Sequence, residues 1–110
     1  MEIIIESPHF TINKLLKEYT EKKVSKLTHI DDRIIKCEVL LKLDKSGTDD
    51  NKVCEIIMNT RHTPMFASSK SNTFEEAITE TVHAIEKQLK KKIAKKRTIA
   101  DEYSNLNPEN

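Results

Sequence analysis

The chain has 110 residues, enough for one domain with a single core, and a formal net charge of only +1, with 36% hydrophobic and 34% charged residues. One glycine and no tryptophan exclude a glycine-rich phosphate loop and an indole stacking platform. Residues 1–6 lack the basic region of a signal peptide, and no stretch approaches the roughly 18 apolar residues of a membrane span, so we expect a cytoplasmic protein.

Residues 2–6 and 13–28 predict a strand followed by a helix. The first segment is rich in isoleucine, whose β-branched side chain favours strands. In the second, apolar side chains recur at spacings of three and four, which indicates a helix with one buried face. Asn13 precedes this pattern and can cap the helix by accepting a hydrogen bond from a free amide of the first turn. The predicted buried face comprises Leu16, Tyr19, Thr20, Val24 and Leu27.

Three further strands are predicted, at residues 33–44, around residues 54–61 and at residues 65–69. In the first two, apolar and polar side chains alternate, which is typical of strands with one buried and one exposed face. Cys37 and Cys54 fall on the buried faces, where we predict two reduced thiols; a disulfide or a redox role is the alternative. The residues predicted to face the core are Ile35, Cys37, Val39, Leu41, Leu43, Cys54, Ile56 and Met58.

The last predicted helix begins after Thr73 and ends near residue 97. Thr73 and Glu76 have the spacing of a capping box, in which each side chain satisfies a free amide of the first turn. Residues 98–110 are weakly acidic and predict a short disordered tail. The chain therefore divides into a folded domain at residues 1–97 and a tail. The apolar stripe of the helix comprises Phe74, Ile78, Val82, Ile85, Leu89 and Ile93.

The element order β-α-β-β-β-α predicts an α/β (α+β) fold with a four-stranded mixed sheet. The first crossover connection should be right-handed and should make the first two strands parallel. The other strands should join as antiparallel hairpins. Because one face of the sheet alternates with polar residues, we expect both helices to pack on the other face.

Positive charge is concentrated near the end of the last helix. Residues 87–97 hold seven basic residues and no acidic one, so the rest of the chain carries a formal charge of about −6. Basic residues four apart share one helix face, and such rows occur in both predicted helices. We predict a groove or ridge of lysines that binds the phosphate backbone of nucleic acid; a helix end that only keeps the protein soluble is the alternative. The residues are Lys22, Lys23, Lys26, Lys87, Lys90, Lys91 and Lys95.

Three blocks of residues, in their order and spacing, match a known family pattern. They are Ile12, Lys17, Lys23 and Lys26-Leu27, then Asp32-Arg33-Ile34, then Phe66-Ala67-Ser68 with Ala77-Ile78 and Lys87-Gln88-Leu89-x-Lys91. Over residues 2–97 the chain resembles the ribosome hibernation-promoting factor and ribosome-associated inhibitor family, also called sigma-54 modulation proteins. Glu75 and Thr79 depart from the family pattern. The resemblance implies RNA-binding roles for Lys17, Lys23, Lys26, Lys87, Lys91 and Lys95.

The resemblance implies a fold similar to double-stranded RNA-binding domains and a ribosome hibernation factor. Such a protein binds the small ribosomal subunit in the channel for mRNA and tRNA, inhibits translation in stationary or stressed cells and, in short members, promotes inactive ribosome dimers. The implied partners are the small subunit and its ribosomal RNA, with a ribosome modulation factor as an option left open. The 13 tail residues are too few for the second domain of long members, and their weak acidity favours the hibernation-promoting type over the inhibitor type.

An enzyme is a competing hypothesis, and we predict against it because the four histidines are scattered without ligand or catalytic spacing. We accordingly expect no catalytic residue, metal, cofactor or small-molecule substrate. Two non-catalytic functions stay open. The first is a generic double-stranded RNA-binding domain, and the second is a protein-interaction module that uses the exposed sheet residues Leu40 and Ile57. The histidines are His9, His29, His62 and His83.

Overall fold

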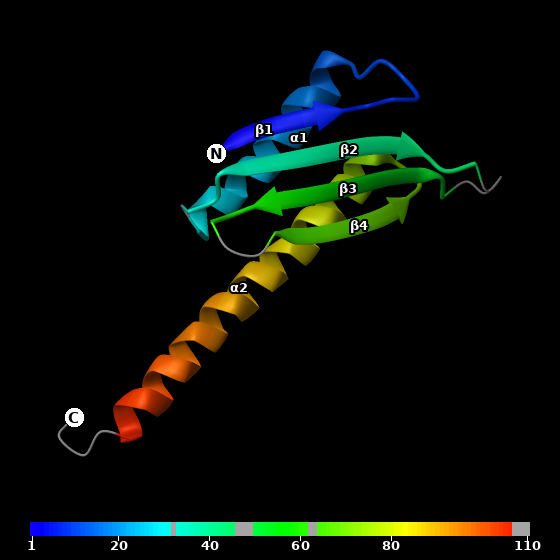
Figure 1. The fold of residues 1–110 in the computed structure, drawn as a ribbon. Helices are drawn as coiled ribbons and strands as arrows, with labels where there is room; N and C mark the ends of the chain where they lie inside the picture. Colours follow the sequence, from blue (N-terminus) through cyan, green and yellow to red (C-terminus); the bar gives the residue numbers. More distant parts are fainter. Residues whose placement is uncertain (32, 46–49, 62–63, 107–110) are drawn as a thin grey trace.

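The elements follow one another in the predicted order, β-α-β-β-β-α, with one additional turn of 3₁₀-helix (Figure 1). The structure is a computed structural model that describes residues 1–31, 33–45, 50–61 and 64–106, with side chains up to Ile93. Asp32, His62 and Thr63 of the sequence predictions lie outside the described residues. The elements are β1 (Glu2–Glu6), α1 (Lys14–Ser25), the 3₁₀-helix η1 (Lys26–His29), β2 (Lys36–Leu43), β3 (Lys52–Asn59), β4 (Met65–Ser71) and α2 (Phe74–Leu106).

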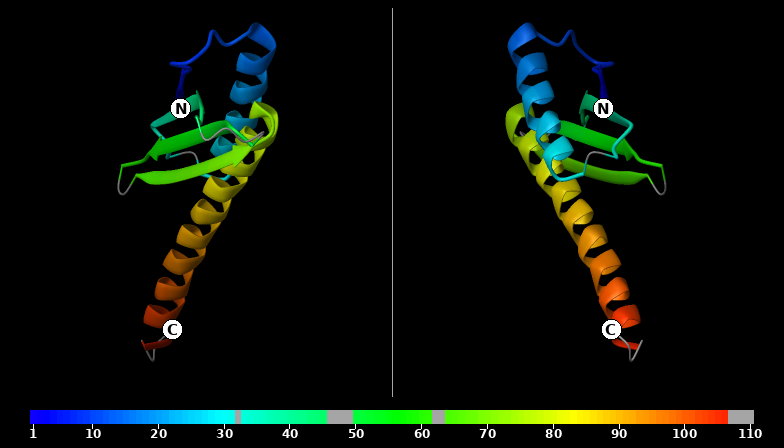
Figure 2. Two further views of the ribbon diagram at one scale, coloured as in Figure 1. Left: turned by 90° about the vertical axis from the view of Figure 1, so that its right-hand side faces the viewer. Right: turned by 90° about the vertical axis from the view of Figure 1, so that its left-hand side faces the viewer.

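The four strands form one mixed sheet in the order β1-β2-β3-β4. β1 and β2 are parallel, and the other two pairs are antiparallel, so the predicted topology is confirmed. α2 packs on β3 and β4, while α1 packs on β1 and on α2. Figure 2 shows that both helices lie on the same side of the sheet. Among the described elements, none covers the other face of the sheet.

The core lies between the sheet and the two helices, as the alternation of apolar residues predicted. Its two buried threonines are satisfied within the helices: the Thr20 hydroxyl donates to the Leu16 carbonyl, and the Thr81 hydroxyl to the Ala77 carbonyl. Side chains that are less than 2% exposed include Val24, Leu27, Val39, Leu41, Ile56, Met58, Ile78, Ile85 and Leu89.

Two of the predicted core positions on the second strand are wrong in part. Ile35 is 55% exposed although its backbone bonds to Glu2 and Asn59, because it lies at the end of the sheet, where Ile34 and not Ile35 is buried in the core. Leu43 is half-buried, since it is the last residue of β2 and lies at the end of the sheet.

The helix starts are as predicted, but the ends differ. Asn13 Oδ1 accepts a hydrogen bond of 2.8 Å from the Leu16 amide, and Thr73 Oγ1 accepts one of 3.1 Å from the Glu76 amide. The first helix changes to η1 after Ser25 instead of staying α-helical to residue 28. The predicted end of the last helix near residue 97 is wrong, because α2 continues to Leu106, and no glycine or proline interrupts it. The division into a binding domain and a tail at residue 97 stays a prediction.

Cys37 and Cys54 are buried and free, which confirms the prediction of two reduced thiols. The register places them opposite Met58 and Leu41, so they are not direct cross-strand neighbours. Burial raises the pKa of each thiol from 9.0 to about 12. Since the thiolate is the nucleophile, neither cysteine is reactive in the folded protein near neutral pH.

We therefore expect both cysteines to resist iodoacetamide in the folded protein at about pH 8 and to react once urea unfolds it. Folding favours the protonated thiols, so their contribution to stability is complete below about pH 9 and is lost as the pH rises towards about 12. Mass spectrometry of the labelled protein checks the first expectation. Native labelling at the rate of a free thiol would show that these strands open readily.

Candidate nucleic-acid interface

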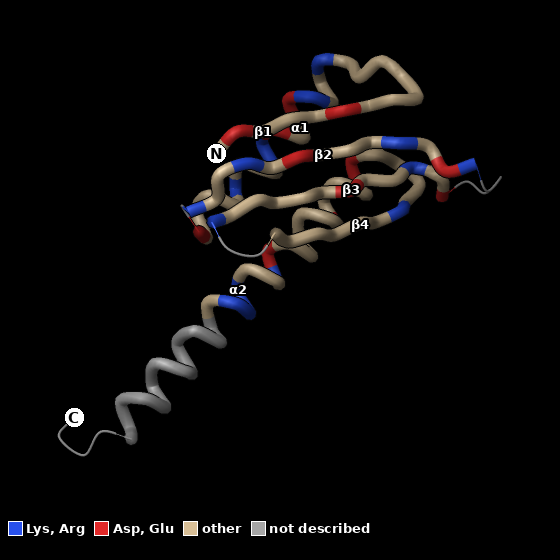
Figure 3. The backbone as a smooth tube through the Cα atoms, viewed as in Figure 1, with Lys and Arg blue, Asp and Glu red and all other residues tan. Residues whose placement is uncertain are grey.

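The predicted RNA-binding lysines lie on α1, η1 and α2, and α1 and α2 pack side by side on one face of the sheet. The two long helices are in direct contact, because the Tyr19 hydroxyl and Thr79 Oγ1 are hydrogen-bonded at 2.9 Å. Figure 3 shows basic residues on both helices, with a group on α2 where this helix leaves the sheet. We call the following residues the basic surface: Lys22, Lys23, Lys26, Lys87, Lys90 and Lys91.

The α1 part of this surface is held in place by an aromatic ring. Lys22 and Lys26 are exposed, whereas Lys23 is half-buried. The ammonium of Lys23 lies 5.5 Å from the centroid of the Tyr19 ring, in the range of a cation–π interaction. Because Tyr19 also bonds to α2, the ring ties the lysines of α1 to the second helix.

Lys17 is exposed but does not join the other lysines of α1. At about 100° per residue, its position lies roughly 120–140° around the helix from Lys22 and Lys23. The contact with α2 is made on the side of Tyr19. Lys17 therefore lies on a different side of α1 from Lys22 and Lys23.

The α2 part of the basic surface is anchored to the sheet from the opposite side of the helix. Lys87, Lys90 and Lys91 are exposed, while Leu89 between them is only 1% exposed and lies in the core. The Gln88 amide donates a hydrogen bond of 2.9 Å to the Phe66 carbonyl of β4. These two anchors fix which side of α2 faces solvent. Lys95 lies on the same helix, and its side chain is outside the described part of the chain.

Glu86 places a carboxylate inside the basic surface, a feature that the sequence prediction missed. Its Oε1 atom lies 3.0 Å from the ammonium of Lys90. The side-chain hydrogen bond with Lys90 lowers the pKa of Glu86 below its usual value, and the charges of His83 and Lys26 act in the same direction. The spacing of Glu86 and Lys90 is the signal that would have indicated this pair from sequence.

Lys26 belongs to η1 and Glu86 to α2, and the charge of Lys26 is one of the smaller causes of the lowered pKa of Glu86. The Glu86 carboxylate is therefore ionised and lies beside the ammonium group of Lys90. That the lysine rows of the two helices form one groove or ridge stays a prediction.

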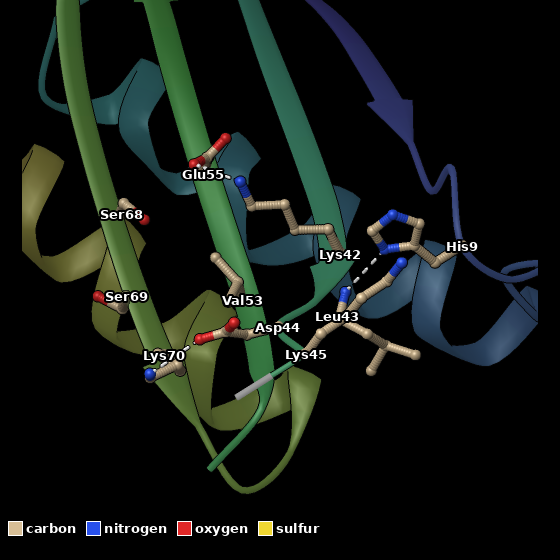
Figure 4. A pocket seen from close by; sticks show the side chains of 10 residues that line it. All are labelled: His9, Lys42, Leu43, Asp44, Lys45, Val53, Glu55, Ser68, Ser69 and Lys70. Atoms are coloured by element: carbon tan, nitrogen blue, oxygen red, sulfur yellow. Dashed lines mark hydrogen bonds and ion pairs between the residues drawn. The ribbon is translucent and has the colours of Figure 1, made fainter. Parts of the chain in front are cut away.

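A concavity of about 630 Å³ at the far end of the sheet is lined by both lysines and carboxylates (Figure 4). Its Lys42 and Lys70 ammonium groups pair with Glu55 at 3.1 Å and with Asp44 at 3.0 Å. His9 Nδ1 accepts a hydrogen bond of 3.2 Å from the Leu43 amide, which gives this histidine a structural contact.

The described residues contain neither a metal-binding cluster nor a membrane-spanning helix. Within these residues, no group of three or more His, Cys, Asp or Glu side chains is arranged to hold a metal ion. In the same part of the chain, no helix combines the length and the apolar character needed to cross a membrane.

Comparison with known proteins gives a family match and two similar structures. The family model described as Sigma 54 modulation protein / S30EA ribosomal protein matches residues 3–97. A ribosomal subunit interface protein from Coxiella burnetii has a similar fold, with a TM-score of 0.76, 22% identity and coverage of 86% of this chain and 99% of that chain. The Thermus thermophilus Protein Y N-terminal domain is also similar, with a TM-score of 0.69, 22% identity and coverage of 83% of this chain and 98% of that chain. A search of curated protein sequences finds no match.

Proposed function

The chain belongs to the Sigma 54 modulation protein / S30EA ribosomal protein family, whose members are non-catalytic and bind the ribosome, and from this premise we propose that it is a ribosome hibernation factor. In this proposal it binds the small ribosomal subunit of the cytoplasmic ribosome in the channel for mRNA and tRNA. It thereby inhibits translation in stationary or stressed cells. The observation that carries the proposal is the basic surface built by two adjacent helices.

The chemistry of this surface suits the phosphate backbone of ribosomal RNA. Lysine ammonium groups neutralise phosphates and release the counterions condensed on the RNA, which gives an affinity that falls steeply with salt. The Tyr19 ring contacts Lys23 and its hydroxyl bonds to Thr79. We propose that Lys22, Lys23, Lys26, Lys87, Lys90 and Lys91 contact phosphates. Lys17 and Lys95 remain candidates from the family resemblance.

Competition separates this proposal from a generic double-stranded RNA binder. Binding is measured with empty small subunits, with small subunits already loaded with mRNA and tRNA, and with a long RNA duplex. We expect binding to the empty subunits and its loss when the channel is filled. Equal binding to loaded subunits, or a preference for the duplex, would favour the generic RNA-binding domain.

We also propose that the protein promotes inactive ribosome dimers. The support is the family match over residues 3–97 together with the resemblance of the chain to hibernation-promoting members. Sedimentation of purified ribosomes through a sucrose gradient, with and without the protein and with and without a ribosome modulation factor, tests this step. We expect a dimer peak that requires the protein. Ribosomes that stay single under all four conditions would refute this part alone.

Replacing Glu86 with glutamine is expected to strengthen binding to small subunits. The change removes the carboxylate that pairs with Lys90 and leaves its ammonium free for a phosphate. One additional phosphate contact is worth up to about eightfold in affinity at about 0.1 M salt. Glu18→Gln is the matched control, since Glu18 also pairs with a lysine four residues away, Lys14, but outside the basic surface. Equal effects of the two variants would argue against a local role of Glu86.

A further inference from the structure

The uncovered face of the sheet has a composition opposite to that of the basic surface. The strand register arranges its central side chains in two rows that cross all four strands. The first row is Ile4, Glu38, Ile57 and Phe66. The second row is Glu6, Leu40, Glu55 and Ser68. We call these eight residues the outer sheet face.

Several large apolar side chains on this face are exposed to solvent. Phe66 is 54% exposed and Ile57 is 40% exposed, and the register makes them direct cross-strand neighbours. Leu40 and Ile4 are half-buried on the same face. Clustered exposed apolar residues of this kind mark interaction surfaces more often than isolated ones do.

Carboxylates surround these apolar residues. A small concavity of about 170 Å³ is lined by Glu6, Glu38 and Glu55 together with Val39, Leu40 and Ile57, and no lysine or arginine is among these lining residues.

The carboxylates already hold cations from the ends of the sheet. The ammonium of Lys36 lies 3.3 Å from Glu38, and that of Lys42 lies 3.1 Å from Glu55. Both pairs are partly exposed, and each contributes little to the stability of the fold. A cationic side chain of a partner can therefore share Glu38 or Glu55 with the lysine that already pairs with it.

We propose that the outer sheet face binds an extended, basic polypeptide segment in which lysine or arginine alternates with aliphatic residues. Its cationic side chains would pair with Glu6, Glu38 and Glu55, and its aliphatic side chains would pack on Ile57 and Phe66. Alternation matches the two rows, because successive side chains of an extended chain point to opposite sides and every second one faces the sheet.

Charge decides between this partner and two others. RNA is disfavoured because Glu6, Glu38 and Glu55 outnumber the two lysines that pair with them, Lys36 and Lys42, and the remaining negative charge repels phosphates. A second copy that pairs through the same face would bring carboxylates together, and one that uses its basic surface would lose that surface for ribosomal RNA. The basic polypeptide is the partner that satisfies both the charge and the apolar surface.

The test uses isotope-labelled full-length protein and a synthetic ten-residue peptide that alternates lysine and valine, followed by two-dimensional NMR. The control peptide has glutamate in place of each lysine. We expect amide shifts at the outer sheet face with the lysine peptide and none with the control peptide. Shifts confined to the acidic first turn of α2, Glu75 and Glu76, or equal shifts with both peptides, would overturn the proposal.

Two sets of variants make the test specific. The variant Glu38→Gln/Glu55→Gln should lower the affinity for the peptide roughly tenfold, since it removes two carboxylates that would pair with the cationic side chains of the peptide. The variant Ile57→Thr/Phe66→Thr keeps residues that favour strands and should also weaken it. Undiminished binding by both variants would overturn the proposal.

The variant Lys87→Glu/Lys91→Glu separates this proposal from the proposed function. Peptide binding should be unchanged in this variant, because the basic surface lies on the other side of the molecule. Loss of peptide binding there would overturn the outer sheet face as the site. Failure to bind ribosomes would leave the peptide result intact, so the two proposals can fail separately.

Discussion

Reversing the charge of both Lys87 and Lys91 to glutamate is expected to weaken binding to the small ribosomal subunit by about 60-fold at about 0.1 M salt. The estimate follows from counterion release, in which each phosphate contact contributes roughly eightfold at this salt concentration. Both side chains are exposed, and neither has a carboxylate partner among the described residues. The loss should therefore appear in binding and not in stability. Fluorescence anisotropy of labelled protein with small subunits measures it.

The salt dependence of the same variant provides a second, independent measure. Loss of two phosphate contacts should reduce the slope of log K against log salt by about 1.4–1.8. The matched control is Lys45→Glu/Lys52→Glu, which changes the net charge equally at the other end of the sheet, where Lys45 lines the concavity of Figure 4. An equal loss of affinity in this control would show that only overall charge matters, and the basic surface would then have no special role.

Truncating Leu89 to alanine is expected to lower the free energy of unfolding by about 2–5 kcal/mol. Leu89 is 1% exposed and fixes the basic end of α2 against the core, so its truncation leaves a cavity under Lys87 and Lys91. Urea denaturation followed by circular dichroism measures the change. Leu89→Met keeps the volume and should cost less than about 1.5 kcal/mol. Similar losses for both variants would mean that this part of α2 is not closely packed.

The fold could be predicted from sequence because its signals are local. The alternation in β2 and β3, the spacing of apolar residues in α2 and the Asn13 cap each depend on neighbouring residues, and the structure contains all of them. The errors arose at element ends. Ile35 continues the alternating pattern of β2, and its backbone bonds to Glu2 and Asn59, yet its side chain is 55% exposed; periodicity alone does not show which positions at the end of a sheet the core covers.

The candidate site was predicted less completely, because it depends on contacts between helices. Counting charges found the lysine rows, but it did not show that Tyr19 binds both Lys23 and Thr79. It also did not show that Glu86 pairs with Lys90 at 3.0 Å among the predicted RNA-binding lysines. The bond between Tyr19 and Thr79 follows from the packing of α1 against α2, which no local pattern in the sequence specifies.

The most direct test of the proposed function is co-sedimentation of the unaltered protein with purified small ribosomal subunits across a salt series, with large subunits as the control. We predict that the protein sediments with small subunits at about 0.05 M salt and is released as the salt concentration approaches about 0.5 M. It should remain in the supernatant with large subunits. A protein that stays in the supernatant with small subunits at the lowest salt, or that sediments equally with both subunits, would contradict the proposal.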